Sequence, residues 1–224
     1  MIIQYPEDLL AEIKEKMADH RLAGFTPGQG KVKPDIMLVG EAPGRHEEVY
    51  KIPFSGASGK ELMKMLASIG YQRDDVYITS VVRQRPYSIK QVINKKTGEK
   101  VEKKPNRTPT QKEVLAFAKL FDWELGQIQP QIIVPLGNTA LHRLLGPKSN
   151  IGRLHGKVIH EKIQMASAEG KGYQLSPGKY WLVPMYHPAA VLYSRKLEPT
   201  INDDWQELGE FIHEFKQVKV TERD

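Results

Sequence analysis

The chain has 224 residues, of which 40% are hydrophobic and 27% are charged. These proportions are ordinary for a globular protein, and no apolar run approaches the roughly 20 residues that cross a bilayer, so we expect no membrane partner. The sequence contains no cysteine. This absence excludes disulfides, thiolate catalysis and cysteine-ligated iron–sulfur clusters, and it is typical of a protein of the reducing cytoplasm.

Positive charge exceeds negative charge by +6, and most of the excess lies in one segment. Residues 88–104 contain six lysines and two glutamates, a net charge of +4. A basic segment of this kind is typical of proteins that bind nucleic acid. It is equally typical of a solvated hairpin whose lysines keep it soluble, and composition alone leaves both interpretations open.

Hydrophobic periodicity predicts an alternation of helices and strands. In chain order we expect a helix at 7–20, a strand at 35–39, a helix at 58–69, a strand at 76–79, a hairpin at 92–101, a helix at 110–127, a strand at 132–136, a helix at 138–145, strands at 156–163 and 179–185, and a helix at 203–218. Alternating strands and helices predict a mainly parallel sheet with helices on both faces. No long linker divides the chain, so we expect one α/β domain over residues 1–224.

The residues that follow the predicted strands carry most of the candidate chemistry. Glu41 follows the first strand and Ser80 the second, while Gly137 and Asn138 follow the third and His187 the last. In parallel sheets, ligands bind beyond the carboxyl ends of the strands, so these groups are expected to share one rim.

Each candidate also has a structural interpretation. Glu41 either orients water and stabilises positive charge, or caps backbone N–H groups of its own loop. His187, which Pro188 restricts to an extended backbone, is either a functional imidazole or a structural one. Phe54 either packs in the core or stacks on a nucleobase.

Residues 55–60 partly match a phosphate-binding loop, but their glycine spacing and the Glu after Lys60 do not fit a nucleoside triphosphatase. Small residues before a helix still suit one phosphate of a nucleic-acid strand. The other histidines show no metal-ligand spacing, so we expect no metal.

Six short motifs lie in one order along the chain: GEAPG at 40–44, PFSG at 53–56, VYITSVV at 76–82, RP at 85–86, IIVPLG at 132–137 and YHPA at 186–189. Together they resemble the family 4 uracil-DNA glycosylases over about residues 17–192. The resemblance implies a three-layer α/β/α domain around a four-stranded, mainly parallel sheet. It also implies a DNA-repair enzyme that flips uracil out of DNA, hydrolyses its N-glycosidic bond and leaves an abasic site.

The resemblance also implies a role for each matched residue. Glu41 would act near the sugar and the attacking water, and His187 would donate a hydrogen bond to a uracil carbonyl. Phe54 would stack on the base. The other implied base-binding residues are Gly40, Ala42 and Ser80, and the expected DNA contacts are Ser55, Gly56, Ser58, Arg83, Arg85, Gly137, Asn138 and Pro188.

Three features depart from the family pattern. The family has four cysteines that bind a [4Fe–4S] cluster, whereas the aligned positions here are Met17, His20, Gln84 and Phe117. One potential ligand in four cannot hold a cluster, so we expect no cofactor. Ser80 stands where the family has a uracil-reading Asn, which predicts looser base selectivity or slower uracil removal, with hypoxanthine or xanthine as candidate further substrates. Residues 88–104 form an insertion that we expect to contact phosphates.

The sequence is compatible with three hypotheses. The first is a monofunctional DNA glycosylase, expected to be a monomer and to leave the strand uncut because no lysine stands at a nucleophile position. The second is a non-catalytic protein that binds damaged DNA, supported mainly by Ser80. The third, a small-molecule hydrolase, lacks a nucleophile elbow and a metal site. The presence of both Glu41 and His187 favours the enzyme.

Overall fold

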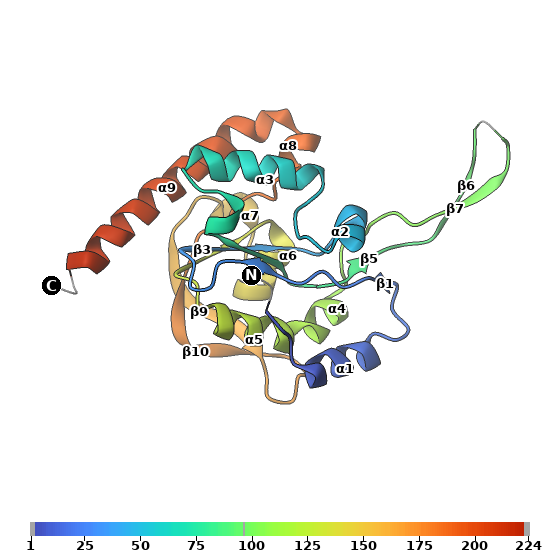
Figure 1. Ribbon diagram of the computed structural model, residues 1–224, viewed down its shortest axis with the longest axis horizontal. Helices are drawn as coiled ribbons and strands as arrows, with labels where there is room; N and C mark the ends of the chain where they lie inside the picture. The colour runs from blue at the N-terminus through green and yellow to red at the C-terminus, as the bar shows by residue number, and fades with distance from the viewer. Residues whose placement is uncertain (1–2, 96, 222–224) are drawn as a thin grey trace.

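The computed structural model describes residues 3–95 and 97–221, which form a six-stranded sheet between layers of helices (Figure 1). The strands lie in the order β2-β4-β3-β8-β10-β9. Four central strands are parallel, namely β4 (Tyr77–Ser80), β3 (Ile36–Gly40), β8 (Ile132–Pro135) and β10 (Tyr173–Leu182), while β2 (Gln29–Gly30) and β9 (Ile159–Ala166) are antiparallel edges. The expected four-stranded parallel sheet is therefore the centre of a larger mixed one.

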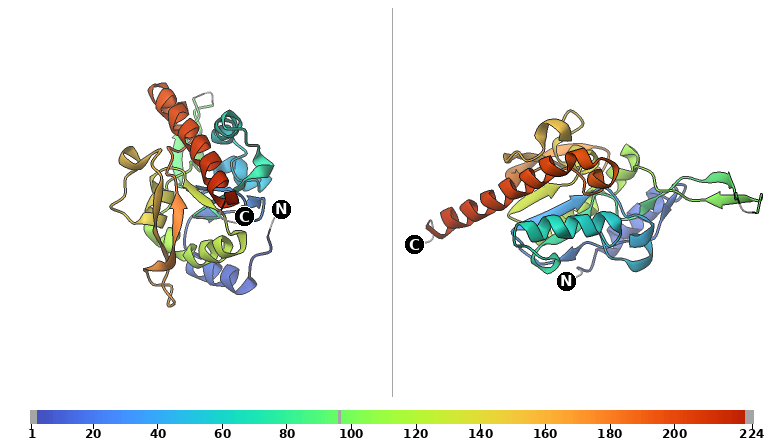
Figure 2. Two further views of the ribbon diagram at one scale, coloured as in Figure 1. Left: turned by 90° about the vertical axis from the view of Figure 1, so that its left-hand side faces the viewer. Right: turned by 90° about the horizontal axis from the view of Figure 1, so that it is seen from above.

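Helices cover both faces of the sheet (Figure 2). One face carries α1 (Glu7–Lys16), α4 (Gln111–Ala116), α5 (Ala118–Ile128) and α6 (Asn138–Leu145), and the other carries α3 (Ala57–Ser68), α8 (Ala189–Tyr193) and α9 (Glu198–Thr221). The connections include α2 (Arg45–Tyr50), α7 (Ile151–Leu154) and the 3-10 turns η1 (Arg73–Asp75) and η2 (Arg195–Leu197). Across the described residues, no helix combines the length and apolarity that a bilayer crossing needs.

Strand β3 explains why the sheet has two cores. All five of its residues are buried. Ile36 and Leu38 pack in the core beneath α3 and α9, whereas Met37 and Val39 pack in the core beneath α1 and α5. A strand that is buried on both faces carries apolar residues at successive positions, and this segment has that pattern.

Some elements differ from the sequence-based expectation. The predicted helix at 110–127 is two helices, because the chain turns at Phe117, whose ring is buried in the core. The last helix begins earlier, at Glu198, and α2 has no counterpart among the predicted elements.

The predicted hairpin at 92–101 is present as strands β6 (Lys90–Ile93) and β7 (Lys100–Lys103). Its turn is closed by hydrogen bonds from Asn94 N–H to the Glu99 carbonyl and from Gly98 N–H to the Asn94 carbonyl, both 2.8 Å. Gly98 has φ +73°, a conformation that favours glycine. Lys96 of this turn lies outside the described residues. Beside the hairpin, β1 (Leu22–Ala23) pairs with β5 (Arg85–Pro86).

Candidate active site

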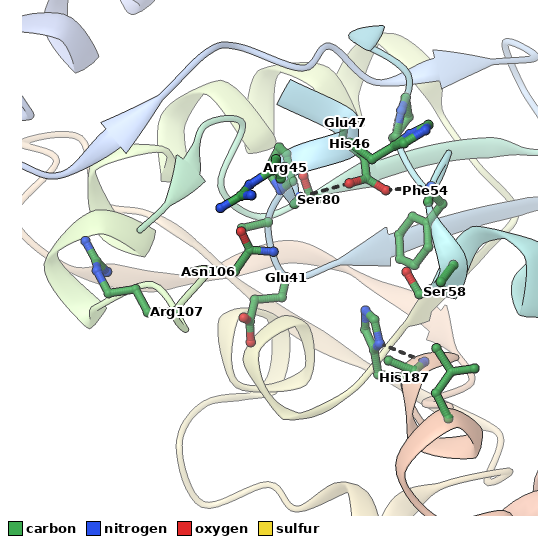
Figure 3. Close-up of a pocket in the computed structure, with 18 of the residues that line it drawn as sticks. Glu41, Arg45, His46, Glu47, Phe54, Ser58, Ser80, Asn106, Arg107 and His187 are labelled. Carbon is green, nitrogen blue, oxygen red and sulfur yellow. Dashed lines mark hydrogen bonds between the residues drawn. The ribbon is translucent and has the colours of Figure 1, made fainter. Parts of the chain in front are cut away.

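The parallel strands end at one rim, where a cavity of about 560 Å³ opens (Figure 3). Glu41 enters it from the end of β3, Ser80 from the end of β4 and His187 from the segment after β10. Phe54 enters from the loop before α3. As the strand-end argument predicted, Glu41, Ser80 and His187 share one cavity, whereas Gly137 and Asn138 do not line it.

Glu41 is held from one side by α6. Its Oε2 accepts a hydrogen bond from the hydroxyl of Thr139, and this contact fixes the carboxylate within the cavity. Burial raises the pKa of Glu41, and the bond from Thr139 partly opposes the rise. A desolvated carboxylate whose second oxygen remains available is suited to binding water or to stabilising positive charge.

His187 is a neutral imidazole with a defined tautomer. Its Nδ1 accepts a hydrogen bond from the backbone N–H of Ala189 at 3.2 Å, so the ring proton lies on Nε2. Burial lowers the pKa of His187 to about 4, although the negative charge of Glu47 opposes this shift. At neutral pH the ring is therefore an uncharged hydrogen-bond donor through Nε2.

Phe54 has a left-handed backbone, with φ +51°. Arg73 holds this loop, because its guanidinium donates to the carbonyls of Pro53 at 2.8 Å and Phe54 at 2.7 Å. The ring packs over Gly40, where an added Cβ would lie 2.6 Å from ring carbon Cε2. Its centroid lies 5.5 Å from that of His187. Gly40 thus makes room for the aromatic wall of the cavity.

Ser80 lines the cavity at the end of β4, beside Gly40 in the parallel register. Its side chain is buried, and its hydroxyl donates a hydrogen bond to the Val82 carbonyl at 2.8 Å. Because this bond uses the hydroxyl proton, Ser80 presents only acceptor lone pairs to the cavity.

Glu47 is a buried carboxylate that sequence analysis did not identify. Its oxygens accept the backbone N–H groups of Gly44 at 3.1 Å, Ser55 at 3.2 Å and Gly56 at 3.0 Å. One side chain therefore ties the loop after β3 to the loop before α3. A Glu three residues into a helix that follows a Gly-rich turn is a capping-box spacing, and this signal was available in the sequence.

The two predicted arginine contacts to DNA are wrong in this structure. Arg83 is only 1% exposed and pairs with Glu124, which is fully buried. Arg85 is 5% exposed and binds Glu48, Asn106 and the Lys104 carbonyl. Both guanidiniums are used inside the fold, so neither faces a phosphate.

The remaining predicted DNA contacts divide into two groups. Gly56 and Ser58, at the start of α3, line the cavity. The others do not line it: Ser55 bonds His46 at 3.0 Å, Asn138 accepts the Ile151 N–H at 2.9 Å, Gly137 packs against His187 and Pro188 is the N-cap of α8. Ala42, predicted at the base-binding site, lines the cavity as expected.

Asn106 and Arg107 also line the cavity, at the point where the chain returns from the insertion. Arg107 binds the Glu113 carboxylate through two nitrogens at 2.6 and 2.7 Å. Sequence analysis did not single out these residues, although their place directly after a basic segment was a usable signal.

The four positions that align with the family's cluster cysteines do not fit an iron–sulfur cluster. Met17 and Phe117 are buried in the hydrophobic core. The Nδ1 of His20 bonds Glu113 at 2.9 Å, and Gln84 offers an amide. A thioether, a phenyl ring and an amide do not replace thiolates. In the described part of the chain, no group of three or more His, Asp or Glu residues is placed to hold a metal ion.

Comparison with known proteins agrees with this geometry. The family model of the Uracil DNA glycosylase superfamily matches residues 27–209. The chain belongs to this superfamily.

Within the superfamily, the chain groups with the type-4 enzymes. The Type-4 uracil-DNA glycosylase of Archaeoglobus fulgidus is 36% identical over 190 residues, which cover 83% of this chain and 81% of the relative. That of Saccharolobus solfataricus is 31% identical over 214 residues, covering 92% and 86%. A DNA polymerase of Bacillus phage SP01 is 29% identical over 83% of this chain, but only 16% of the polymerase is matched.

Proposed function

We propose that this protein is a monofunctional DNA glycosylase that removes a deaminated base, foremost uracil, and leaves an abasic site. The observation that carries the proposal is the cavity shared by Glu41, Phe54 and His187. A base stacked in a duplex cannot reach such a cavity, so the nucleotide must be flipped out. Because the three residues assigned to the chemistry all belong to one chain, the reaction needs no second subunit, and we propose that the protein acts as a monomer.

His187 is assigned to the departing base. Cleavage of the N-glycosidic bond leaves negative charge on the base, and a fixed Nε2–H donor stabilises that charge at a carbonyl oxygen. A well-placed donor of this kind contributes about 3 kcal/mol to the transition state. Because its pKa is about 4, His187 stays neutral and stabilises the anion without giving up its proton.

Glu41 is assigned to the sugar and the attacking water. The sugar becomes positively charged as the bond breaks, as in other glycosyl transfers. A carboxylate in the low dielectric of the cavity stabilises that charge and accepts a proton from water. The hydrogen bond from Thr139 leaves Oε1 available for this role.

The cavity mouth offers groups that suit flipped DNA. Phe54 provides a flat surface on which the base stacks. Leu192 and Tyr193, which are 50% and 90% exposed, lie at the mouth and would fill the gap that the flipped base leaves in the duplex. Gly56 and Ser58 at the N-terminus of α3 would receive a phosphate.

The test uses oligonucleotides that carry one uracil, hypoxanthine or xanthine, followed by alkali to cut abasic sites. We expect alkali-dependent cleavage of the uracil strand and at least a roughly 10²-fold slower reaction for Glu41→Gln. Strand cleavage without alkali would contradict a monofunctional enzyme. If the folded protein binds these strands but releases no base, it is a non-catalytic reader of damaged DNA.

A second candidate is a glycosylase with relaxed base selectivity, and the Ser80 geometry favours it. Uracil, hypoxanthine and xanthine all offer an N–H donor beside a carbonyl acceptor. Because the Ser80 hydroxyl donates to Val82, it accepts the N–H but offers no donor to the carbonyl. An Asn amide serves both groups of uracil and, unlike a rotating hydroxyl, rejects cytosine, so Ser80→Asn should raise the uracil-to-cytosine ratio of kcat/KM about tenfold. An unchanged ratio would remove Ser80 from base recognition.

We further propose that activity needs no iron–sulfur cluster, because Met17 and Phe117 are buried in the core, while His20, which is hydrogen-bonded to Glu113, and Gln84 offer no thiolate. Protein purified without added iron should release base at full rate. Stoichiometric iron that is lost together with activity would contradict this.

A further inference from the structure

The insertion at residues 88–104, here called the arm, projects from the body of the molecule (Figures 1 and 2). Seven of the eight residues in strands β6 and β7 are exposed, and only Val92 is partly buried. An isolated two-stranded ribbon is marginally stable in water at best. The arm therefore adds little to the core, and its charge needs a separate explanation.

The lysines of the arm repel one another. Lys90 lies directly opposite Lys103 in the antiparallel register, and like charges in that position are destabilising. Within the described part of the arm, the ion pair present is Lys104–Glu102 at 3.6 Å, and no carboxylate pairs with Lys90, Lys100 or Lys103. An arrangement that is unfavourable by itself becomes favourable when anions lie between and beside these side chains.

The root of the arm is fixed to the rim of the cavity. Arg45, which lines the cavity, donates to the Lys104 carbonyl at 3.0 Å. Arg85 donates to the same carbonyl and, through Nε, to Asn106 Oδ1 at 2.7 Å. Since Asn106 also lines the cavity, the direction of the arm is set relative to the flipped nucleotide.

We propose that the arm binds backbone phosphates of the duplex on one side of the flipped nucleotide. An extended strand rises about 3.3 Å per residue, so the six steps from Ser88 to Asn94 reach about 20 Å. Phosphates follow one another at about 3.4 Å along the helix axis, so the arm reaches about six base pairs beyond the cavity. This inference rests on the proposed glycosylase function, because it takes the cavity as the place of the flipped nucleotide.

The test compares two double variants that each remove two positive charges. Lys90→Gln with Lys103→Gln removes two of the six positive charges of the arm, whereas Lys162→Gln with Lys171→Gln removes two exposed lysines of β9 and the β9–β10 turn, away from the arm (Figure 1). Binding to a 30-base-pair duplex with one central uracil is measured by fluorescence anisotropy between 50 and 200 mM salt. A cleavage-resistant 2′-fluoro sugar at the uracil keeps the DNA intact.

The slope of log affinity against log salt concentration falls in magnitude by about 0.9 for each lost phosphate contact. In the arm variant, which lacks two lysines, this slope should therefore fall by about 1.8. The fall in affinity across this salt range should then be about tenfold smaller than in the wild type, while the control pair keeps the wild-type slope. Shortening the duplex to three base pairs on the side that the arm occupies should weaken binding by the wild type more than binding by the arm variant, which keeps fewer charges to lose.

An unchanged salt slope in the arm variant, or equal sensitivity to shortening, overturns the inference and assigns the arm to a protein partner or to solvent. Base release by the wild type from a short uracil-containing single strand is measured in parallel. If base is released but the slope does not change, the arm inference alone fails. If no base is released but the slope changes, the proposed chemistry fails while the arm remains a phosphate-binding element.

Discussion

The state of His187 makes a quantitative prediction about stability. An unfolded histidine titrates near pH 6.5, whereas burial lowers the pKa of His187 in the folded protein to about 4. Between these values the unfolded chain binds a proton that the folded protein does not. The stabilisation is therefore complete above pH 6.5 and is lost as the pH falls from 6.5 to 4.

The magnitude follows from the two pKa values. Between pH 8 and pH 5, this one residue should lower the free energy of unfolding by about 2 kcal/mol. A His187→Gln variant cannot take up the proton, so its unfolding free energy should fall by about 2 kcal/mol less than that of the wild type over the same interval. Other titrating groups cancel, because both proteins contain them.

The assay is urea unfolding of both proteins at pH 8, 7, 6 and 5, with His213→Gln as control. His213 is exposed on α9, and its removal should leave the wild-type curve unchanged. Parallel curves for the wild type and His187→Gln would refute the argument that His187 is desolvated and neutral. The assignment of Nε2–H as a neutral donor to the departing base would then lose its basis.

Further predictions concern residues that hold the site in place. Glu124→Gln should cost about 3–5 kcal/mol of unfolding free energy in urea titrations, because it leaves the buried charge of Arg83 unpaired. Gly59→Ala places a Cβ 1.8 Å from the Phe54 carbonyl and should cost at least about 2 kcal/mol by overpacking. Gly126→Ala, where a Cβ meets nothing within 4 Å, should leave the free energy of unfolding unchanged or raise it. A loss of unfolding free energy as large as that of Gly59→Ala would refute the steric argument. Glu47→Gln weakens three charge-assisted bonds, so kcat should fall more than tenfold; an unchanged kcat would rule out a positioning role.

The sequence predicted the strand ends well because two independent patterns agree there. The apolar run at 35–39 requires a strand that is buried on both faces, and polar residues that follow such a strand must lie at its carboxyl end. Glu41 and His187 were located in this way. The edge strands β2 and β9 and the short helix α2 were missed or only partly predicted, since they have weak periodicity.

The direction of long side chains was not predictable from strand ends alone. Arg83 follows a strand as Glu41 does, yet its guanidinium turns inward. The decisive signal lies elsewhere in the sequence, because Glu124 is on the apolar face of α5 with Phe121, Leu125 and Ile128. A carboxylate at a core position of a helix requires a buried cation or hydroxyl partner, and Arg83 supplies the cation.

Glu113 indicates how the protein holds together the segments that carry the family's cluster cysteines. Its carboxylate bonds His20 after α1, Arg107 at the cavity rim and the Thr110 N–H at the start of α4. Burial alone would raise the pKa of Glu113, but these hydrogen bonds lower it to about 2, so the carboxylate stays ionised. One buried charge therefore links the segment after α1 and the start of α4 to a residue of the cavity. The groups that make this link are a carboxylate, an imidazole, a guanidinium and a backbone N–H, none of which oxidises as a thiolate does.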